Sequence, residues 1–406
     1  MKKTLITILI ILVCIGCSSN RAEYPDDPLF ANQVSYQNKG GSVTLDQLSF
    51  RKSSVELNLK EDIHLHLVSA WTITKGSKQT VVALLDDGFF YNHVDVRDNI
   101  WRNPGETGMD ANGYPKETNG IDDDGNGYVD DVMGWDFYFN DPDPDCYIYD
   151  GKFDTSIQPY PHAMDAMGII GAKGNNGVGV AGINWDVSMM LLKMMAQGSA
   201  AWENPLLRIP KATEAIRYAV NNGARVINWS GFVNTKDLEK LKPLKEAIDY
   251  AESKGVLLVV AAGNDLKNID EEENLIYPAC FPNENILCVG EIDFNGQLYV
   301  VPPGSRYVGG SNYGEKNVDI AAIGQNYTTY LRNNCSVYRL GGGTSDSAPV
   351  VTGVAALILT LRPDLNAAQV KQIIMESATP LAGLQGKIKC GGMVNAISAL
   401  EMARSF

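Results

Sequence analysis

Three short segments of the chain carry residues that could act together in nucleophilic chemistry. Asp86 ends the apolar run VVALLD, His162 opens the segment HAMDAMGIIGA, and Ser345 lies within GGGTSDSAP. A carboxylate that orients an imidazole, and an imidazole that accepts a serine proton, activate serine for acyl transfer. Each residue alone also fits a plainer role: a turn aspartate, a structural histidine and a helix-capping serine. The three together predict a serine nucleophile.

A fourth residue fits the same chemistry. Asn264 follows the apolar run VVAAG, a position from which its amide could donate a hydrogen bond to an oxyanion. The alternative is an ordinary turn asparagine after a glycine. The first N–H groups of a helix beginning near Ser345 would be unpaired and could serve the same oxyanion. Beside the acid, Asp87 looks more exposed than Asp86.

The elements that must position these residues follow an alternating pattern. Short apolar runs rich in valine and isoleucine alternate with helix-like stretches that end at glycine, which predicts an α/β fold with a doubly wound parallel sheet. The predicted strands cover residues 81–85, 189–195, 225–228, 256–261 and 286–289. The predicted helices cover residues 212–220, 244–251, 347–361, 366–377 and 395–403. We expect the second helix to begin at Pro243 or just before it, because proline is costly inside a helix.

Taken in chain order, these segments resemble the subtilisin-like serine peptidase family from about residue 57 to residue 403. The DDG sequence at Asp86 matches the family's acid motif, and His162 matches the histidine of HGTHVAG. GTSDSAP around Ser345 matches GTSMAAP, and AAGN at Asn264 matches the oxyanion asparagine. The resemblance implies a subtilisin-like three-layer fold and a serine endopeptidase that forms an acyl-enzyme with its peptide substrate.

The resemblance also implies a role for each matched residue. Ser345 would attack the carbonyl carbon, His162 would carry the proton, Asp86 would orient the imidazole, and Asn264 would stabilise the oxyanion. The same resemblance implies that the edge after VINW binds the substrate backbone, through Ser230, Gly231 and Phe232.

The sequence departs from the family pattern near these residues. Asp165 stands where the motif has its second histidine, and Asp346 follows the serine where the motif has methionine. A carboxylate at Asp346 should oppose the oxyanion unless its side chain turns to solvent. Phe232 replaces a glycine and would narrow the cleft. A catalytically weak or inactive peptide-binding protein of the same fold is therefore an alternative, whereas a lipase or esterase lacks support because GxSxG is absent.

An acidic segment, NGIDDDGNGYVDD, predicts a calcium site. Its D-x-D-x-N-G spacing resembles the first half of a calcium-binding loop. The expected ligands are Asp122, Asp124, Asn126, the Tyr128 carbonyl and Asp130. The alternative is a hydrated turn rich in aspartate and glycine. Calcium is the cofactor that we expect, and no organic cofactor is expected.

The N-terminus resembles a bacterial lipoprotein signal. Two lysines precede a short apolar run that leads to Cys17, so we expect a signal peptide over residues 1–16 and lipid on the Cys17 thiol. A plain secretory leader is the alternative. Residues 17–26 would be a tether, residues 27–56 an N-terminal arm and residues 57–406 the peptidase domain. The protein would then work outside the cytoplasm, in the cell envelope, with the outer membrane as the expected site of its anchor.

Composition narrows the expected partners. The chain has 406 residues with 45% hydrophobic content and a formal net charge of −14. That charge repels phosphate backbones, so nucleic acid is not an expected partner. We expect a monomer that meets a protein or peptide substrate and contacts the membrane through its N-terminal lipid.

Overall fold

The computed structural model describes residues 24–46, 54–146, 161–196, 199, 204–304, 308–332 and 335–406. The predicted signal peptide, Cys17 and all but the last three residues of the predicted tether lie outside the described residues.

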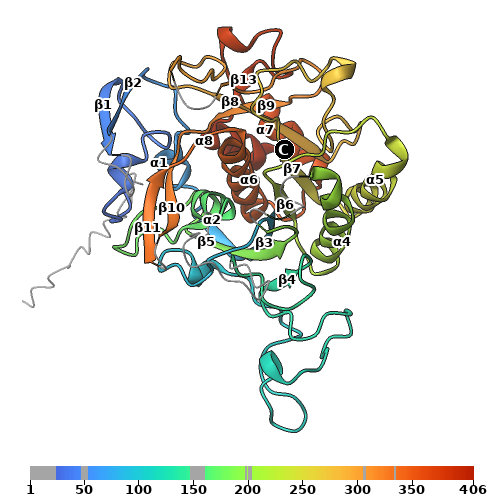
Figure 1. Cartoon of the computed structure of the whole chain (residues 1–406). Helices are drawn as coiled ribbons and strands as arrows, with labels where there is room; N and C mark the ends of the chain where they lie inside the picture. The colour runs from blue at the N-terminus through green and yellow to red at the C-terminus, as the bar shows by residue number, and fades with distance from the viewer. Residues whose placement is uncertain are drawn as a thin grey trace, which may run out of the picture.

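A nine-stranded sheet lies at the centre of the molecule (Figure 1). In spatial order its strands are β12 (Thr379–Pro380), β13 (Gly392–Met393), β9 (Ile320–Ile323), β8 (Ile286–Ile292), β7 (Leu257–Ala261), β6 (Val226–Trp229), β3 (Gly76–Asp86), β5 (Asp186–Lys193) and β4 (Gly134–Asp136). All neighbours pair in parallel except β12 and β13. Because β3 lies between β5 and β6, the winding direction reverses at β3, and Asp86 ends that strand at the point where such sheets build their sites.

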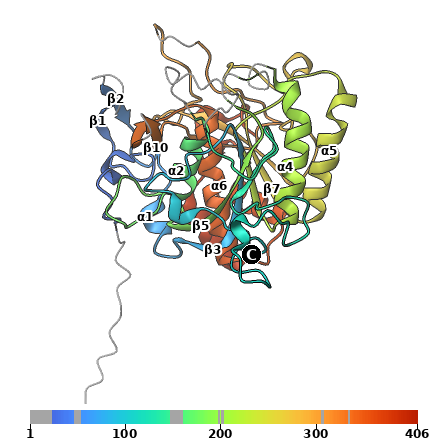
Figure 2. The ribbon, with the colours of Figure 1, turned by 60° about the horizontal axis from the view of Figure 1, so that its bottom comes forward.

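Helices cover both faces of the sheet. The helices α4 (Arg208–Asn221) and α5 (Leu238–Ser253) lie on one face. On the other face lie α1 (Leu67–Ala70), α2 (Ala163–Gly171), α6 (Thr344–Leu361), α7 (Ala367–Glu376) and α8 (Ala396–Ser405). Figure 2 shows the two groups separated by the sheet. The prediction of a doubly wound α/β fold is therefore confirmed.

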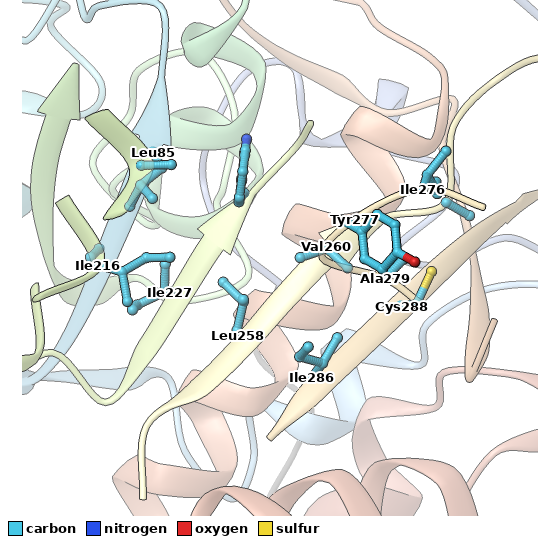
Figure 3. Packing of buried hydrophobic residues seen from close by; sticks show 14 of the residues in the cluster. Leu85, Ile216, Ile227, Leu258, Val260, Ile276, Tyr277, Ala279, Ile286 and Cys288 are labelled. Atoms are coloured by element: carbon cyan, nitrogen blue, oxygen red, sulfur yellow. The ribbon is translucent and has the colours of Figure 1, made fainter. Parts of the chain in front are cut away.

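Alternation along the strands divides the core in two. Leu85, Ile227 and Leu258 belong to the cluster under α4 and α5, where Ile216 of α4 meets them (Figure 3). Their chain neighbours, such as Leu84, belong to the cluster under α6. Both faces are apolar because both are covered, which explains the continuous hydrophobic runs in the sequence.

The predicted strands and helices are found, with shifts at their ends. The prediction that the second helix begins near Pro243 is wrong, because α5 begins at Leu238 and contains Pro243. The Asp237 side chain accepts a hydrogen bond from the Lys240 N–H and caps the helix there. Pro243 lies in the second turn, where it leaves a single helical hydrogen bond unmade.

Smaller elements complete the fold. A hairpin of β10 (Tyr327–Arg332) and β11 (Cys335–Leu340) lies against α2, and a hairpin of β1 (Gly41–Asp46) and β2 (Ser54–Leu59) lies in the region predicted to be an arm. The boundary predicted at residues 56 and 57 falls inside β2. Short 3-10 turns are η1 (Phe30–Asn32), η2 (Arg97–Asn99), η3 (Lys116–Thr118), η4 (Pro205–Leu207), η5 (Glu272–Asn274) and η6 (Ala382–Leu384).

Candidate active site

Asp86 and His162 meet at the carboxyl end of β3. Both carboxylate oxygens of Asp86 lie near Nδ1 of His162, at 2.9 and 3.0 Å. Asp86 is almost fully buried, whereas the His162 side chain keeps 26% of its surface exposed. This geometry makes Nδ1 the donor to the carboxylate. Nε2 is then the imidazole nitrogen that could exchange a proton with a nucleophile.

Asp87 fixes the start of the histidine-bearing helix. Its carboxylate accepts hydrogen bonds from the His162 N–H at 3.0 Å and the Ala163 N–H at 3.1 Å. The first N–H groups of a helix lack intrahelical acceptors, so Asp87 acts as a cap contributed by another segment. The expectation that Asp87 is the more exposed carboxylate is wrong: Asp87 is 2% exposed and Asp86 is 3% exposed.

Ser345 lies in the first turn of α6, where the helix N-terminus meets the end of β6. The Ser345 hydroxyl donates to the Ser230 carbonyl at 3.3 Å, and the Ser230 hydroxyl donates to the Ser345 carbonyl at 2.7 Å. Pro349 has no N–H to offer that carbonyl one turn later, so Ser230 supplies the missing donor. Gly343 enters the helix at φ 100°, a conformation that other residues rarely adopt.

Asn264 is oriented by the same helix N-terminus. Its Oδ1 accepts hydrogen bonds from the Thr344 N–H at 2.9 Å and the Thr344 hydroxyl at 3.1 Å. These contacts assign the amide orientation, because the oxygen must face both donors. Asn264 is exposed, and no described residue accepts a hydrogen bond from its Nδ2. The amide N–H groups therefore remain available at the edge where Ser345 lies.

Charges around the imidazole favour its protonated form. Burial opposes that form, but Asp86, with smaller contributions from Asp87 and Asp165, outweighs burial and raises the pKa of His162 to about 10. Burial and the neighbouring Asp86 also raise the pKa of Asp87 to about 7. The site thus concentrates carboxylates about one imidazole.

A cavity of about 290 Å³ opens beside these residues. Asp86 and His162 lie at one side of the cavity, and its wall includes Trp229, Ser230, Gly231 and Phe232. Phe232 is half-buried and packs against the core beneath α4 and α5. The three residues predicted to bind substrate therefore border the same space as the predicted acid and base.

The buried Glu291 and the partly buried Arg339 were missed by the sequence analysis. Oε1 of Glu291, on β8, accepts a hydrogen bond from the Gly343 N–H at 3.1 Å, and burial raises the pKa of Glu291 to about 8. Arg339, on β11, pairs with Asp165 on α2. No motif marks either residue, because only the folded chain brings β8 and β11 beside the two helices.

The acidic segment engages its predicted calcium ligands in hydrogen bonds within turns. The Asp122 carboxylate accepts the N–H groups of Gly125 and Gly127, at 2.7 and 2.8 Å, and the Asp130 carboxylate accepts that of Gly120 at 3.2 Å. Turn hydrogen bonds therefore occupy both carboxylates. Oδ1 of Asn126 accepts the Tyr128 N–H, while its Nδ2 donates to Asp131 at 3.0 Å. Of the five predicted ligands, the structure brings only Asp124 into a carboxylate cluster.

That cluster consists of Glu106, Asp124 and Asp131. One carboxylate oxygen from each lies within 4.8 Å of the others. Glu106 is fully buried, and its Oε2 has no hydrogen-bond partner among the described residues. Gly105 leaves room for Asp124, since a Cβ there would lie 2.4 Å from the Asp124 side chain. A cluster of three carboxylates that includes an orphaned buried oxygen fits a hard cation such as calcium.

Known proteins share this sequence pattern and fold. The chain is 30% identical over 346 residues to Subtilisin-like protease 1 of Plasmodium berghei, a match that covers 82% of this chain and 51% of that protein. It is 26% identical over 331 residues to a thermophilic serine proteinase of a Bacillus strain, covering 82% and 64% of the two chains. The chain thus spans about half the length of the Plasmodium relative.

The fold and the sequence lead to the same family. A solved protease structure from Pseudoalteromonas arctica superposes with a TM-score of 0.64 at 24% identity, covering 94% of this chain and all of that one, which confirms the predicted subtilisin-like fold. Residues 77–391 match the sequence profile described as the subtilase family. Because that match spans most of the chain, the protein belongs to the subtilase family.

Proposed function

We propose that the protein is a serine endopeptidase that hydrolyses peptide bonds through Asp86, His162 and Ser345. The observation that carries the proposal is the contact of Nδ1 of His162 with both Asp86 oxygens, at 2.9 and 3.0 Å. His162 opens α2, and α2 packs against α6, whose first turn carries Ser345. A histidine with a purely structural role would not be expected to combine a buried carboxylate at one ring nitrogen with a cavity beside the ring.

Each residue has one step in the proposed reaction. The Ser345 hydroxyl attacks the substrate carbonyl carbon while Nε2 of His162 takes its proton, and Asp86 stabilises the imidazolium. Nδ2 of Asn264 and the Ser345 N–H donate to the oxyanion. The imidazolium then protonates the leaving amine, and water hydrolyses the acyl-enzyme with the same proton transfers. The cavity wall at Ser230, Gly231 and Phe232 receives the substrate chain.

A weakly active or inactive peptide-binding protein is the second candidate. The observation in its favour is Asp346, a carboxylate that is 2% exposed in the turn that bears Ser345. The Asp346 side chain does not turn to solvent, which was the condition under which its charge would not oppose the oxyanion. The electrostatic cost to the oxyanion then depends on what neutralises the buried carboxylate.

Digestion of a proteome-derived peptide library separates the two candidates. The purified protein should generate new peptide termini with a preference on the acyl side of the cut, and the Ser345→Ala variant should generate none. Binding of peptides without new termini, with equal affinity in both proteins, would support the binding protein and reject the enzyme.

We also propose a structural calcium ion held by Glu106, Asp124 and Asp131. A bound divalent cation would offset the repulsion of three clustered carboxylates and stabilise the surrounding segment. Asn103 supports the arrangement, because its Nδ2 lies 2.9 Å from Asp124 and 2.8 Å from Asp131. Figure 1 places the segment that precedes β4 at the edge of the molecule, away from α2 and α6, so the ion would have no role in the reaction.

We propose that the protein is exported, anchored to the cell envelope through lipid on Cys17 and active as a monomer, with the outer membrane as its site. The basis is the lipoprotein-like N-terminus of the sequence. Metabolic labelling with an alkyne fatty acid tests the anchor. Label in the wild type and loss of label in Cys17→Ser supports it, whereas unlabelled, soluble secreted protein in both would reject it.

A further inference from the structure

The two helices that carry His162 and Ser345 each place an aspartate in their first turn. Asp165 lies in α2 and is 3% exposed, and Asp346 lies in α6 and is 2% exposed. Burial raises the pKa of Asp165, and the negative charge of Asp346 raises that pKa further. Two buried carboxylates whose charges also act on the imidazole of His162 are costly unless a cation faces them.

Arg339 of β11 is that cation. Its Nε donates to one oxygen of Asp165 at 3.0 Å, and its Nη2 donates to the other, which makes a two-point fork. The guanidinium also lies 4.5 Å from the centre of the Tyr330 ring. Its positive charge acts on Asp346 as well and is the largest influence favouring the ionised form of that carboxyl.

The hairpin that carries Arg339 is fixed to α2 by further contacts. The Thr328 hydroxyl donates to the Asp165 carbonyl at 3.1 Å, and the Thr329 hydroxyl donates to the Met164 carbonyl at 2.8 Å. Gly168 permits this approach, because a Cβ there would lie 2.3 Å from the Thr328 hydroxyl. Arg339 therefore stands on a support that is rigid relative to the histidine-bearing helix.

We propose that Arg339 is a positioning residue for the reaction: it holds the first turn of α2 through its fork to Asp165, and its charge offsets the charges of Asp165 and Asp346 at His162. Asp165 and Asp346, the two departures from the family motifs, then share Arg339 as their compensating cation. The inference rests on the proposed endopeptidase activity.

Arg339, Asp165 and Asp346 would act on the reaction through the charge balance at the His162 imidazole. The base must be neutral to accept the serine proton, and every unneutralised carboxylate nearby holds that proton on the imidazole. Among the described residues, the other titratable or charged groups that act on His162, Asp165, Asp346 or their carboxylate neighbours are Asp86, Asp87, Glu291, Tyr36, Tyr330 and Arg208. Arg339 is the cation that contacts the carboxylate of Asp165 directly.

The test is a charge cycle read by two measurements. The first measurement is the midpoint pH at which the His162 imidazole loses its proton. Nitrogen NMR monitors this titration, and comparison with His162→Gln assigns the signal. Asp165→Asn leaves Arg339 with one carboxylate fewer and should lower the midpoint by about 1 pH unit. Adding Arg339→Met to that variant restores the charge balance and should return the midpoint toward the wild-type value.

The second measurement is the rate at which a fluorophosphonate labels Ser345. Arg339→Met should reduce this rate about a hundredfold because the first turn of α2 loses its fork to Asp165 and the two carboxylates lose their counter-charge. Arg339→Lys keeps the charge without the fork and should recover part of the rate. Arg225→Met is the matched control: Arg225 lies at the opposite end of β6, where it donates to the Pro363 and Leu365 carbonyls, and its loss should leave the midpoint and the labelling rate unchanged.

The two readouts separate the inference from the function on which it rests. An unchanged midpoint in Asp165→Asn, or no return in the double variant, would overturn the charge-balancing role of Arg339. Folded wild-type protein that resists labelling would instead reject the proposed activity, while the NMR midpoints still decide the inference. If Arg339→Met fails to fold, the single Asp165→Asn variant still tests the charge balance, because asparagine preserves the side-chain shape.

Discussion

The sheet edge at Asp86 and the acidic segment around Asp124 show two ways of assembling carboxylates. At the sheet edge, a buried strand ends at Asp86, so its carboxylate is held at a fixed place against His162. In the acidic segment, turns use the carboxylates of Asp122 and Asp130 as acceptors for backbone N–H groups. A motif at a strand end thus predicts the position of its side chain well. In a motif made of turns, the same carboxylates can bind a cation or accept backbone N–H groups, so spacing alone predicts the ligands less well.

The largest effect should come from the sheet edge. Ser345→Ala should reduce peptide hydrolysis about 10⁴-fold or more, since the substitution removes the attacking atom. The measurement is kcat/KM on a peptide cut by the wild type. Ser347→Ala is the control within the same helix: its hydroxyl donates to the Ala322 carbonyl, so stability should fall while most activity remains. Full activity in Ser345→Ala would show that this edge does not perform the reaction.

The oxyanion donor should give the next largest effect. Asn264→Ala should lower kcat about 10²- to 10³-fold with little change in KM, because the amide contacts the substrate oxygen only as charge develops. Steady-state kinetics on the same peptide distinguish the parameters. A change confined to KM would contradict the assignment and place Asn264 in ground-state binding.

The acidic segment offers a direct contrast between motif and structure. Millimolar calcium should raise the melting temperature of the wild type by about 5 °C, and Glu106→Gln should abolish that rise. Asp122→Asn should lower the melting temperature at all calcium concentrations because it weakens a turn, yet retain the calcium-dependent rise. Differential scanning calorimetry with and without chelator gives both numbers. If Asp122→Asn abolished the calcium-dependent rise and Glu106→Gln retained it, the result would favour the ligands predicted from the D-x-D-x-N-G spacing.

The smallest effect concerns pH. The pKa of His162 is raised to about 10, so its contribution to stability is fully present below about pH 6.5 and is lost as the pH rises through about 10. The difference in unfolding free energy between wild type and His162→Gln should therefore shrink across that range. Activity should rise over the same range as the imidazole becomes neutral. Urea titrations at several pH values test the first trend, and a stability difference that grows with pH would contradict it.

Much of the fold and site was predictable from sequence because strand ends are marked locally. Apolar runs located β3 and β7. Asp86 ends β3 and Asn264 lies just past the end of β7, as the sequence predicted. The burial of Asp87 was not predictable, because its cause is the pair of N–H groups at the start of α2, which is distant in the chain. Local sequence cannot reveal which distant helix needs a cap.

Two other features were invisible for the same physical reason. Glu106 precedes the D-x-D-x-N-G spacing by many residues and joins Asp124 and Asp131 only when the chain folds back. Arg339 lies in no motif, and its contact with Asp165 depends on how the β10–β11 hairpin docks on α2. Charge compensation of this kind depends on tertiary structure. The sequence showed the two carboxylates, Asp165 and Asp346, but not the cation that compensates them.

Fluorophosphonate labelling with peptide mapping tests the central claim most directly. The folded wild-type protein should carry one adduct, on Ser345, formed faster as the pH rises and absent in His162→Gln. An adduct on another residue, or folded protein that stays unlabelled across the pH range, would contradict the claim that this sheet edge activates a serine.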